Sequence, residues 1–460
     1  MRITKYDLQF TMYGFRGTHS EALAPSGSRI GCEYTNGQRN DARTFPTFTL
    51  VSKISKHKIF NDPIYGFITI PDELTFQLLE HPWFQRLRRI KQLGLTNLVY
   101  PGALHTRFHH AMGAMHLMSE AIEVLRSKGQ EISKEEAQAV TIAILLHDIG
   151  HGPFSHALEH SIVNNVTHED ISELFMERLN KEFRGKLTLA IKIFRDRYKR
   201  KFFHQLVSSQ LDMDRLDYLM RDSFYTGVSE GVISSERIIK MLNVKSDKLV
   251  VESKGIYSVE KFIISRRLMY WQVYLHKTVL SAENLLVNIL KRAKELAGKG
   301  EELFCTPALR TFLYNKFSKR DFLEDKNLLG IFAQLDDNDI TASIKVWCTH
   351  PDKILSMLCS KLVNRQLFRI ELQNEPFEKK RIKQVRARVM KKYKVGKEKV
   401  KYFVFTDAVS NEVYNVDNIR INILFKDGTI LDVAKASDQL NTKVLSRTIK
   451  KYFLCYPKDV

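Results

Sequence analysis

The stretch "LLHDIGHGPFSH", residues 145–156, places His147 directly beside Asp148 and adds His151 and His156 shortly after them. Imidazole and carboxylate groups together are an ordinary ligand set for a divalent metal. A buried His-Asp pair at the end of a helix needs either a metal or a hydrogen-bond partner. The glycine and proline at 152–153 turn the chain, so that His151 and His156 can face a common cleft. Taken with the upstream "RFHH" (107–110) and the downstream "DMDRLDY" (212–218), the stretch predicts a metal centre, whereas a single internal His is more often structural.

The residues before this stretch predict the helix that carries it. Ser133 and Glu136 form a capping box ahead of an apolar periodic run, and the run ends against Gly150. His147 and Asp148 are therefore expected at the C-terminal end of this helix. Three more helices are expected, one over about Arg107–Leu125 that stops at Gly129, one that begins after Thr167, and one over "SSQLDMDRLDYLMRD" at 208–222.

Strand signals are confined to the two ends of the sequence. A short β-like lead-in starts near residue 52, and helical patterns then dominate to about residue 375. Beyond that, "KYFVFT" (401–406) and "INILFKDGTILDVA" (421–434) alternate as strands, and Asp427 with Gly428 predicts a hairpin. A last helix is expected from about Asn441.

The length and composition predict one large core and a smaller lobe. The chain has 460 residues, of which 44% are hydrophobic, and residues 1–50 show no apolar period. The expected fold is mainly α, with a helical core and a smaller C-terminal α+β lobe. The expected divisions are a loose N-terminal extension over 1–51, the main domain over 52–310, a helical extension over 311–390 and the α+β lobe over 391–460.

Several classes of protein are disfavoured by composition. The five cysteines are odd in number and never in C-x-x-C spacing, which argues against a disulfide framework or a thiolate zinc site. No apolar run approaches the roughly 20 residues of a membrane span, and no signal pattern opens the chain, so a cytoplasmic protein without a membrane partner is expected.

The charge balance points to anionic partners. The sequence has 72 Lys and Arg against 52 Asp and Glu, a formal net charge of +20 that attracts polyanions. Residues 379–401 hold twelve Lys and Arg against one carboxylate, Glu398. Such a run is more often a solvated helix face than a site, although it could bind nucleic acid or anionic effectors through phosphates. Tyr393 is its sole aromatic residue, so few bases could stack there.

Six sequence blocks occur in the order of a known family. They are "NDPIYG", "WFQRLRRIKQLG", "YPGALHTRFHHAMG", "LLHDIGHGPFSH", "LDMDRLDYLMRD" and "RRLMYWQVYLHKT", within about residues 55–280. This part of the chain resembles the HD-domain phosphohydrolases, which are named for the adjacent His and Asp. The closer resemblance is to the deoxynucleoside triphosphate triphosphohydrolases. It implies an HD-domain helical core over 52–310 and hydrolysis of a deoxynucleoside triphosphate to deoxynucleoside and inorganic triphosphate.

The resemblance also implies roles for residues around the metal. It gives His110, His147, Asp148 and Asp214 to one divalent ion, and these residues also form the candidate ligand set by residue type. Around the phosphates and the attacking water it places His151, His156, Glu159, His168 and Glu169. His168, oriented by Glu169, is the favoured general acid or base, because imidazole titrates near neutral pH.

Substrate contacts follow from the same resemblance. Arg107 is expected to hold the triphosphate, and Arg215 occupies the position of a phosphate-binding lysine, which keeps the charge and changes its geometry. Tyr218 resembles a tyrosine that lies beneath the deoxyribose and excludes a 2′-hydroxyl, while Asp222 resembles a residue that reads the 3′-hydroxyl. The remaining expected contacts with sugar and base are Gln92, Leu93, Arg266 and Tyr274. Leu275 replaces an expected glutamine, which leaves the base preference open.

A second nucleotide site and an oligomer are implied more weakly. Lys58, Asn61, Gln85 and Arg88 match parts of a nucleotide activator site that promotes tetramers, with Glu80 in place of an aspartate. The same residues could serve folding. A homo-oligomer, dimer or tetramer, is expected.

Other functions and metals are left open by the sequence. Two His with two carboxylates suit Fe, Mn, Zn or Mg to differing degrees. The alternative functions are hydrolysis of another nucleotide phosphoester by the same centre, or a nucleotide-sensing or nucleic-acid-binding scaffold. His109 and His116 have no role in the resemblance, and a structural role is favoured for His116.

Overall fold

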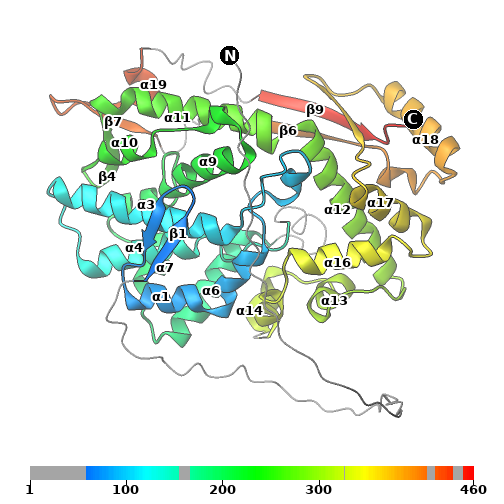
Figure 1. The fold of residues 1–460 in the computed structure, drawn as a ribbon, viewed down its shortest axis with the longest axis horizontal. Coiled ribbons are helices and arrows are strands. Elements are labelled where there is room, and N and C mark those ends of the chain that lie inside the picture. The colour runs from blue at the N-terminus through cyan, green and yellow to red at the C-terminus, as the bar shows by residue number, and fades with distance from the viewer. Residues whose placement is uncertain (1–57, 155–165, 326, 412–419, 439–448) are drawn as a thin grey trace, which may run out of the picture. The chain divides into compact units, whose positions relative to one another are not determined.

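The computed structural model describes residues 58–154, 166–325, 327–411, 420–438 and 449–460. It is mainly helical, with its strands gathered in three small sheets, which confirms the predicted fold class (Figure 1). The strands are β1 Ile59–Asp62, β2 Gly66–Thr69, β3 Leu242–Lys245, β4 Lys248–Glu252, β5 Arg369–Gln373, β6 Phe405–Asn411, β7 Asn422–Leu424, β8 Ile430–Asp432 and β9 Ile449–Tyr456. The helices before residue 300 are α1 Glu73–Glu80, α2 Pro82–Gln85, α3 Arg107–Ser127, α4 Lys134–Leu146, α6 His168–Glu182, α7 Thr188–Phe194, α8 Lys201–Val207, α9 Met213–Thr226, α10 Ser235–Lys240, α11 Ile256–Met269 and α12 Lys277–Ala297. Those after it are α13 Pro307–Tyr314, α14 Lys319–Glu324, α15 Leu328–Phe332, α16 Asp337–Trp347, α17 Lys353–Val363, α18 Lys379–Tyr393 and α19 Val433–Ala436.

Helix α4 is the most deeply buried part of the site scaffold. Every side chain from Ala139 to Leu146 is buried, because α4 packs against α3, α1, α7 and α8. A helix that is apolar on all sides belongs in the centre of a core. The densest apolar run of the sequence is therefore core, and among the described residues no helix is long and apolar enough to cross a membrane.

Side-chain caps set where the four predicted site helices begin. The Ser133 hydroxyl accepts from the Glu136 N–H, and the Glu136 carboxylate accepts from the Ser133 N–H, so the capping box before α4 is confirmed. Thr167 caps α6 as predicted. The fourth helix begins at Met213, later than expected, because Asp212 accepts from the backbone N–H groups of Ser209 and Arg215. That cap fixes Asp214 in the first turn of α9.

The sheets join segments that are far apart in the chain. The hairpin β7–β8 is confirmed, with Gly428 at a φ of +86° in its turn. Strand β7 also pairs in parallel with β4. Strand β4 forms a hairpin with β3, in a region for which the sequence predicted helix. The β3–β4 turn uses Ser246 and Asp247 at φ of 51° and 61°, a conformation that glycine usually signals. In the third sheet, β9 pairs with β5 and β6.

The predicted domain boundaries stay predictions. The helix expected from about Asn441 lies outside the described residues up to 448, and residues 449–456 are the strand β9 and not helix, because they pair with both β5 and β6. The strand expected over 401–406 begins only at Phe405, because Val400–Tyr402 form a short 3-10 turn. Four of the five cysteines are described, and all four are free, as expected.

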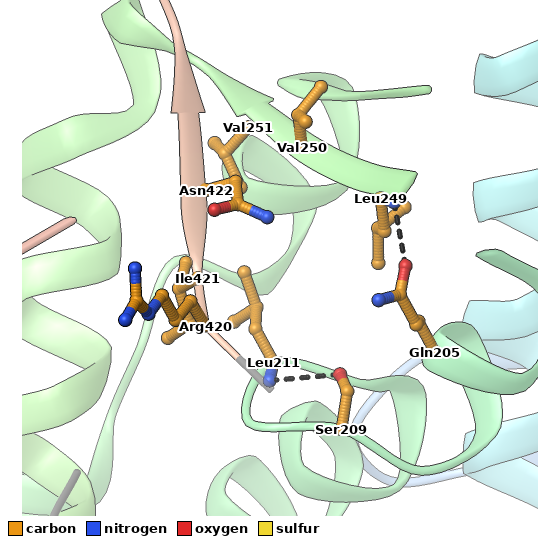
Figure 2. Close-up of a pocket in the computed structure, with 9 residues that line it drawn as sticks. All are labelled: Gln205, Ser209, Leu211, Leu249, Val250, Val251, Arg420, Ile421 and Asn422. Carbon is orange, nitrogen blue, oxygen red and sulfur yellow. Dashed lines mark hydrogen bonds between the residues drawn. The ribbon is translucent and has the colours of Figure 1, made fainter. Parts of the chain in front are cut away.

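A small hollow lies where β4, β7 and the segment between α8 and α9 meet. Figure 2 shows Gln205 and Ser209 at its edge, where the Gln205 side-chain oxygen accepts from the Leu249 N–H at 2.7 Å. The hollow has room for an ordered water but not for a nucleotide. Its lining residues are Gln205, Ser209, Leu211, Leu249, Val250, Val251, Arg420, Ile421 and Asn422.

Candidate metal centre and substrate site

Three helices deliver three potential metal ligands to one point. His110 lies in the first turns of α3, His147 follows the last residue of α4, and Asp214 lies in the first turn of α9. Each offers a ligand atom within 4.8 Å of the other two. The Asp214 Oδ1 atom lies 3.0 Å from His110 Nε2 and 3.5 Å from His147 Nε2. These distances bring the three expected ligands within reach of one ion.

Asp148 lies against the same cluster. Its Oδ1 is 3.3 Å from His147 Nε2, and its Oδ2 is 3.9 Å from His110 Nε2. The Arg107 guanidinium donates to Oδ2 at 2.5 Å. Burial alone would raise the pKa of Asp148, but His147, Arg107 and the other cationic neighbours hold that pKa well below its usual range. Asp148 is therefore ionised and can bind a cation.

The two imidazoles are oriented as metal ligands. The Nδ1 of His147 donates to the Ile144 carbonyl at 2.6 Å, and the Nδ1 of His110 donates to the Asp217 carboxylate at 2.7 Å. A neutral ring with its proton on Nδ1 keeps a lone pair on Nε2. Both Nε2 atoms are buried and have no hydrogen-bond partner among the described residues. A divalent cation would satisfy both lone pairs, so the donor set fits a metal.

The electrostatics of the cluster favour a bound cation. Burial disfavours a charged His110, but interactions with Asp214 and Asp217 outweigh burial and raise its pKa to about 10. Burial also acts to raise the pKa of Asp214, yet His110 and His147 lower it strongly. The carboxylates that hold a proton on His110 would equally stabilise a metal ion in its place.

A buried ion-pair network stands behind His110 and was missed by the sequence analysis. Arg221 donates to both oxygens of Asp217, at 3.0 Å and 2.9 Å, and to Asp62 of β1 at 2.8 Å. Asp217 and Arg221 are fully buried. A Cβ on Gly113 of α3 would lie 1.9 Å from Asp217 Oδ1, so only glycine admits this carboxylate. Two signals were present, namely Asp217 one turn after Asp214 and Gly113 one turn after His110.

A second histidine pair lies beside the metal cluster. The rings of His151 and His168 meet edge to face with centroids 3.8 Å apart, and His168 Nε2 is 3.2 Å from Glu169 Oε1. His151 Nε2 also lies 3.9 Å from Asp148 Oδ1. This geometry brings His151, His168 and Glu169 together, whereas His156 and Glu159 lie outside the described residues.

Gly150 makes the approach of α6 to the metal cluster feasible. A Cβ on Gly150 would lie 2.3 Å from the His168 carbonyl oxygen and 2.3 Å from the Ser172 nitrogen. The Ser172 hydroxyl accepts from the Gly150 N–H at 2.9 Å and donates to the His147 carbonyl at 2.8 Å. The turn after His147 is therefore held directly on α6.

Helix α9 also carries three of the expected substrate contacts. Arg215 pairs with Asp212 at 2.8 Å and lies 3.8 Å from Asp214. Tyr218 meets the Tyr274 ring edge to face, with centroids 6.2 Å apart. Asp222 follows one turn later, so one helix face runs from the metal cluster past these side chains.

Asp222 is held by two hydrogen bonds. His105 Nε2 donates to its Oδ1 at 2.8 Å, and the Tyr274 hydroxyl donates to its Oδ2 at 2.7 Å. His105 is buried and stacks on Tyr225, with ring centroids 4.5 Å apart. His105 stands two residues before Arg107 in "LHTRFHH" and was not among the site residues predicted from the sequence.

The other expected contacts are spread over nearby segments. The Gln92 N–H donates to the His105 carbonyl at 3.0 Å, and its side-chain oxygen is buried with no hydrogen-bond partner in the described part of the chain. Leu93 is partly buried beside it. The Arg266 guanidinium lies 5.9 Å from the centroid of the Tyr270 ring.

His109 and His116 make local contacts. His109 completes the capping box at the start of α3 with Thr106. His116 lies 3.5 Å from Glu120 and against the Tyr65 ring, in keeping with the structural role expected for it.

The four residues of the expected activator site contact their own neighbours among the described residues. Arg88 lies 3.6 Å over the Phe108 ring and donates to Gln85 at 2.7 Å, while Lys58 lies 5.2 Å over the Phe76 ring. Asn61 is in β1, opposite Phe67. Arg88 and Gln85 contact each other, but the activator site stays a prediction.

The site lies in a part of the chain that is similar to known proteins. The family model of the HD domain matches residues 107–226, and that of the HD associated region matches residues 233–303. The crystal structure of a phosphohydrolase from Bacteroides thetaiotaomicron is similar with a TM-score of 0.85 and 55% sequence identity, covering 87% of this chain and 100% of that one. The uncharacterized protein YwfO of Bacillus subtilis is 33% identical over 89% of this chain and 94% of its own. The deoxynucleoside triphosphate triphosphohydrolase SAMHD1 homolog of Dictyostelium discoideum is 31% identical, over 54% of this chain and 51% of its own.

Substitution Asp217→Asn tests the network behind His110. The amide keeps the shape but removes the charge that orients the imidazole and stabilises a cation on it. Affinity for a divalent metal is expected to fall about 10- to 100-fold. Titration of metal-depleted protein with Mn²⁺, read by calorimetry, measures the change. Glu120→Gln, a partly exposed carboxylate on α3, the helix that carries His110, is the matched control and should leave the affinity unaltered. An equal loss in both variants would contradict the assignment.

Proposed function

The chain belongs to the HD-domain phosphohydrolases, and from that premise we propose that it hydrolyses deoxynucleoside triphosphates to deoxynucleoside and inorganic triphosphate. The observation that carries this proposal is the order of side chains along α9. Asp214 faces the metal cluster, Arg215 adds a cation beside it, and Tyr218 and Asp222 follow on the same helix. This order suits a ligand with phosphates at one end and a sugar at the other.

The cationic side chains would hold the phosphates. Arg107 is positioned by Asp148 at the edge of the metal cluster, and Arg215 stands beside Asp214. Their guanidinium groups are fixed before substrate arrives and can offset charge that builds on the phosphate oxygens. A divalent ion held by His110, His147, Asp148 and Asp214 would supply Lewis-acid activation of water and of a phosphate oxygen.

The histidine pair would handle the protons. In the proposed reaction, water attacks the α-phosphorus and the bond to the 5′-oxygen breaks, so that oxygen must gain a proton. His168 is the proposed donor, because Glu169 lies at hydrogen-bond range and orients the ring. His151 packs on His168 and would contact a phosphate oxygen or share the donor role.

The sugar would be read by the aromatic pair and Asp222. Tyr218 and Tyr274 meet edge to face, and Tyr274 donates to Asp222. We assign the 3′-hydroxyl to Asp222 and the exclusion of a 2′-hydroxyl to Tyr218. Gln92, Leu93 and Arg266 are assigned to the remaining contacts with sugar and base.

Product analysis tests the reaction. With Mn²⁺ or Mg²⁺ and each of the four dNTPs, the purified protein is expected to release inorganic triphosphate and deoxynucleoside, separated by anion-exchange chromatography. Asp214→Ala should abolish turnover and lower the bound metal, because it removes a carboxylate that both imidazoles face. Glu324→Ala, an exposed carboxylate on α14, is the control. Release of single phosphates, or turnover only of another nucleotide ester, would instead favour the alternative phosphoester.

Substitution Tyr218→Ala tests the reading of the sugar. Removing the ring opens room for a 2′-hydroxyl, so the preference for a dNTP over the matching NTP, measured as the ratio of kcat/KM values, is expected to fall about tenfold or more. Tyr257→Ala is the control, because Tyr257 is 62% exposed on α11. A ratio that stays at the wild-type value in Tyr218→Ala would contradict the assignment of Tyr218 to exclusion of the 2′-hydroxyl.

A second candidate function is binding of nucleic acid by α18. Its first turn holds Lys379, Lys380 and Arg381 and no acid, against the usual preference of a helix N-terminus for negative charge. Val385 and Val389 are buried, and Lys379, Lys383 and Arg386 are exposed, with no ion pair among the described residues. A polyanion would offset the repulsion within this row, and phosphate contacts would make binding independent of sequence.

Charge reversal tests this second function. Lys379→Glu, Lys383→Glu and Arg386→Glu together are expected to weaken binding of a fluorescent single-stranded DNA at least about tenfold. The slope of log K against log salt should fall by about 2 to 3. The control is the same reversal at the exposed Lys240, Lys245 and Lys248. Equal losses in both triple variants would show a general effect of net charge and contradict a site on α18.

A further inference from the structure

One carboxylate outside the matched family segments connects two loops of the site. Asp337 is the first residue of α16, drawn in yellow in Figure 1, and is buried. Its Oδ1 accepts from the Phe154 N–H at 3.0 Å, across 183 residues of sequence. Its Oδ2 accepts from the Lys91 N–H at 3.0 Å, across 246 residues. The same side chain therefore satisfies two backbone donors that have no local partner of their own.

The first donor belongs to the turn that follows the metal ligands. Phe154 lies three residues after His151 and has a φ of 50°, in the left-handed region that costs a non-glycine residue energy. Its ring packs near Gly94, where an added Cβ would lie 3.9 Å from Phe154 Cδ1. The hydrogen bond that the Phe154 N–H donates to Asp337 holds this strained residue in place.

The second donor belongs to the segment that supports Arg107. Lys91 bridges to Thr106, and the Ile90 carbonyl accepts from the Arg107 N–H at 2.9 Å. The next residue, Gln92, donates to His105. Through Lys91, Asp337 thus reaches the backbone of a phosphate-binding arginine and of a proposed base or sugar contact.

A parallel bridge supports the same arrangement. Arg86 is fully buried and donates to the Ile149 carbonyl at 2.8 Å and to the Leu335 carbonyl at 3.1 Å. It therefore joins the same turn to the residues just before α16. Two independent bridges between residues 86–91, 149–154 and 335–337 define the spacing of these segments.

We propose that Asp337 is a positioning residue that holds the turn after His151 and the segment before Arg107 at the separation required by the substrate phosphates. This role rests on the proposed function. Removing the carboxylate leaves the buried N–H of Phe154 and the partly buried N–H of Lys91 unpaired, which costs more than an ordinary surface hydrogen bond. Both loops would relax, while the metal ligands on α3, α4 and α9 keep their own supports.

The test compares Asp337→Ala with Asp339→Ala. Asp339 lies in the same helical turn but accepts from Asp336 and Thr306, not from the site loops. Hydrogen–deuterium exchange of the Lys91 and Phe154 amides is expected to accelerate about tenfold or more in Asp337→Ala and not in Asp339→Ala. In the folded fraction, kcat/KM for the preferred dNTP should fall about 10- to 100-fold with unchanged bound metal.

The readouts separate failure of this role from failure of the proposed function. If the wild-type protein cleaves no dNTP, hydrolysis of bis(p-nitrophenyl) phosphate replaces the dNTP assay, and amide exchange needs no turnover at all. Unchanged exchange at Lys91 and Phe154 would overturn the positioning role. So would faster exchange with wild-type kcat/KM, because Asp337 would then serve stability alone.

Discussion

The hydrogen bonds that the Nδ1 atoms of His110 and His147 donate are the constraint on which the site depends. Each bond places a proton on Nδ1 and turns Nε2 toward Asp214, where a metal ion would take the place of a second ring proton. One acceptor is the main chain of α4 and the other is Asp217 on α9, so the orientation of the ligands is set by the packing of these helices. A shift of α9 along α3 would move Asp214 and the acceptor of His110 together.

The cost of burying these charges explains why the network extends so far. Asp217 in an apolar interior would favour its neutral form, and Arg221 offsets that cost with hydrogen bonds to both oxygens. Arg221 in turn needs a second carboxylate, which Asp62 supplies from β1. The short hairpin β1–β2 thereby becomes part of the metal site although it contributes no ligand. Glycine at 113 is the steric condition for the whole chain of contacts, because any side chain would occupy the position of Asp217.

The sequence was most informative where the signal is local. The capping box at Ser133 and Glu136, the cap at Thr167 and the Asp427–Gly428 turn all depend on residues within four positions of each other, and each was confirmed. The expected ligands also converge, since the order of motifs resembled a known family. Contacts such as Asp337 with Lys91 are fixed by packing between segments 246 residues apart, and no local pattern encodes them. The β3–β4 hairpin was missed for a different reason, because Ser246 and Asp247 adopt a turn without the glycine that marks one.

The residues that support the site loops lie in a different part of the chain from the proposed ligands. The proposed ligands lie on buried helices or, as His147 and Asp148 do, directly after one. The turn that follows and the segment before Arg107 are held by residues 335–337, beyond both matched segments. A buried helix keeps its ligands in place through many contacts and needs no single partner. A loop has few such contacts, so one carboxylate with two backbone donors can decide its position. The region after the HD core is therefore part of the site in a physical sense, because the spacing of the site loops is determined there.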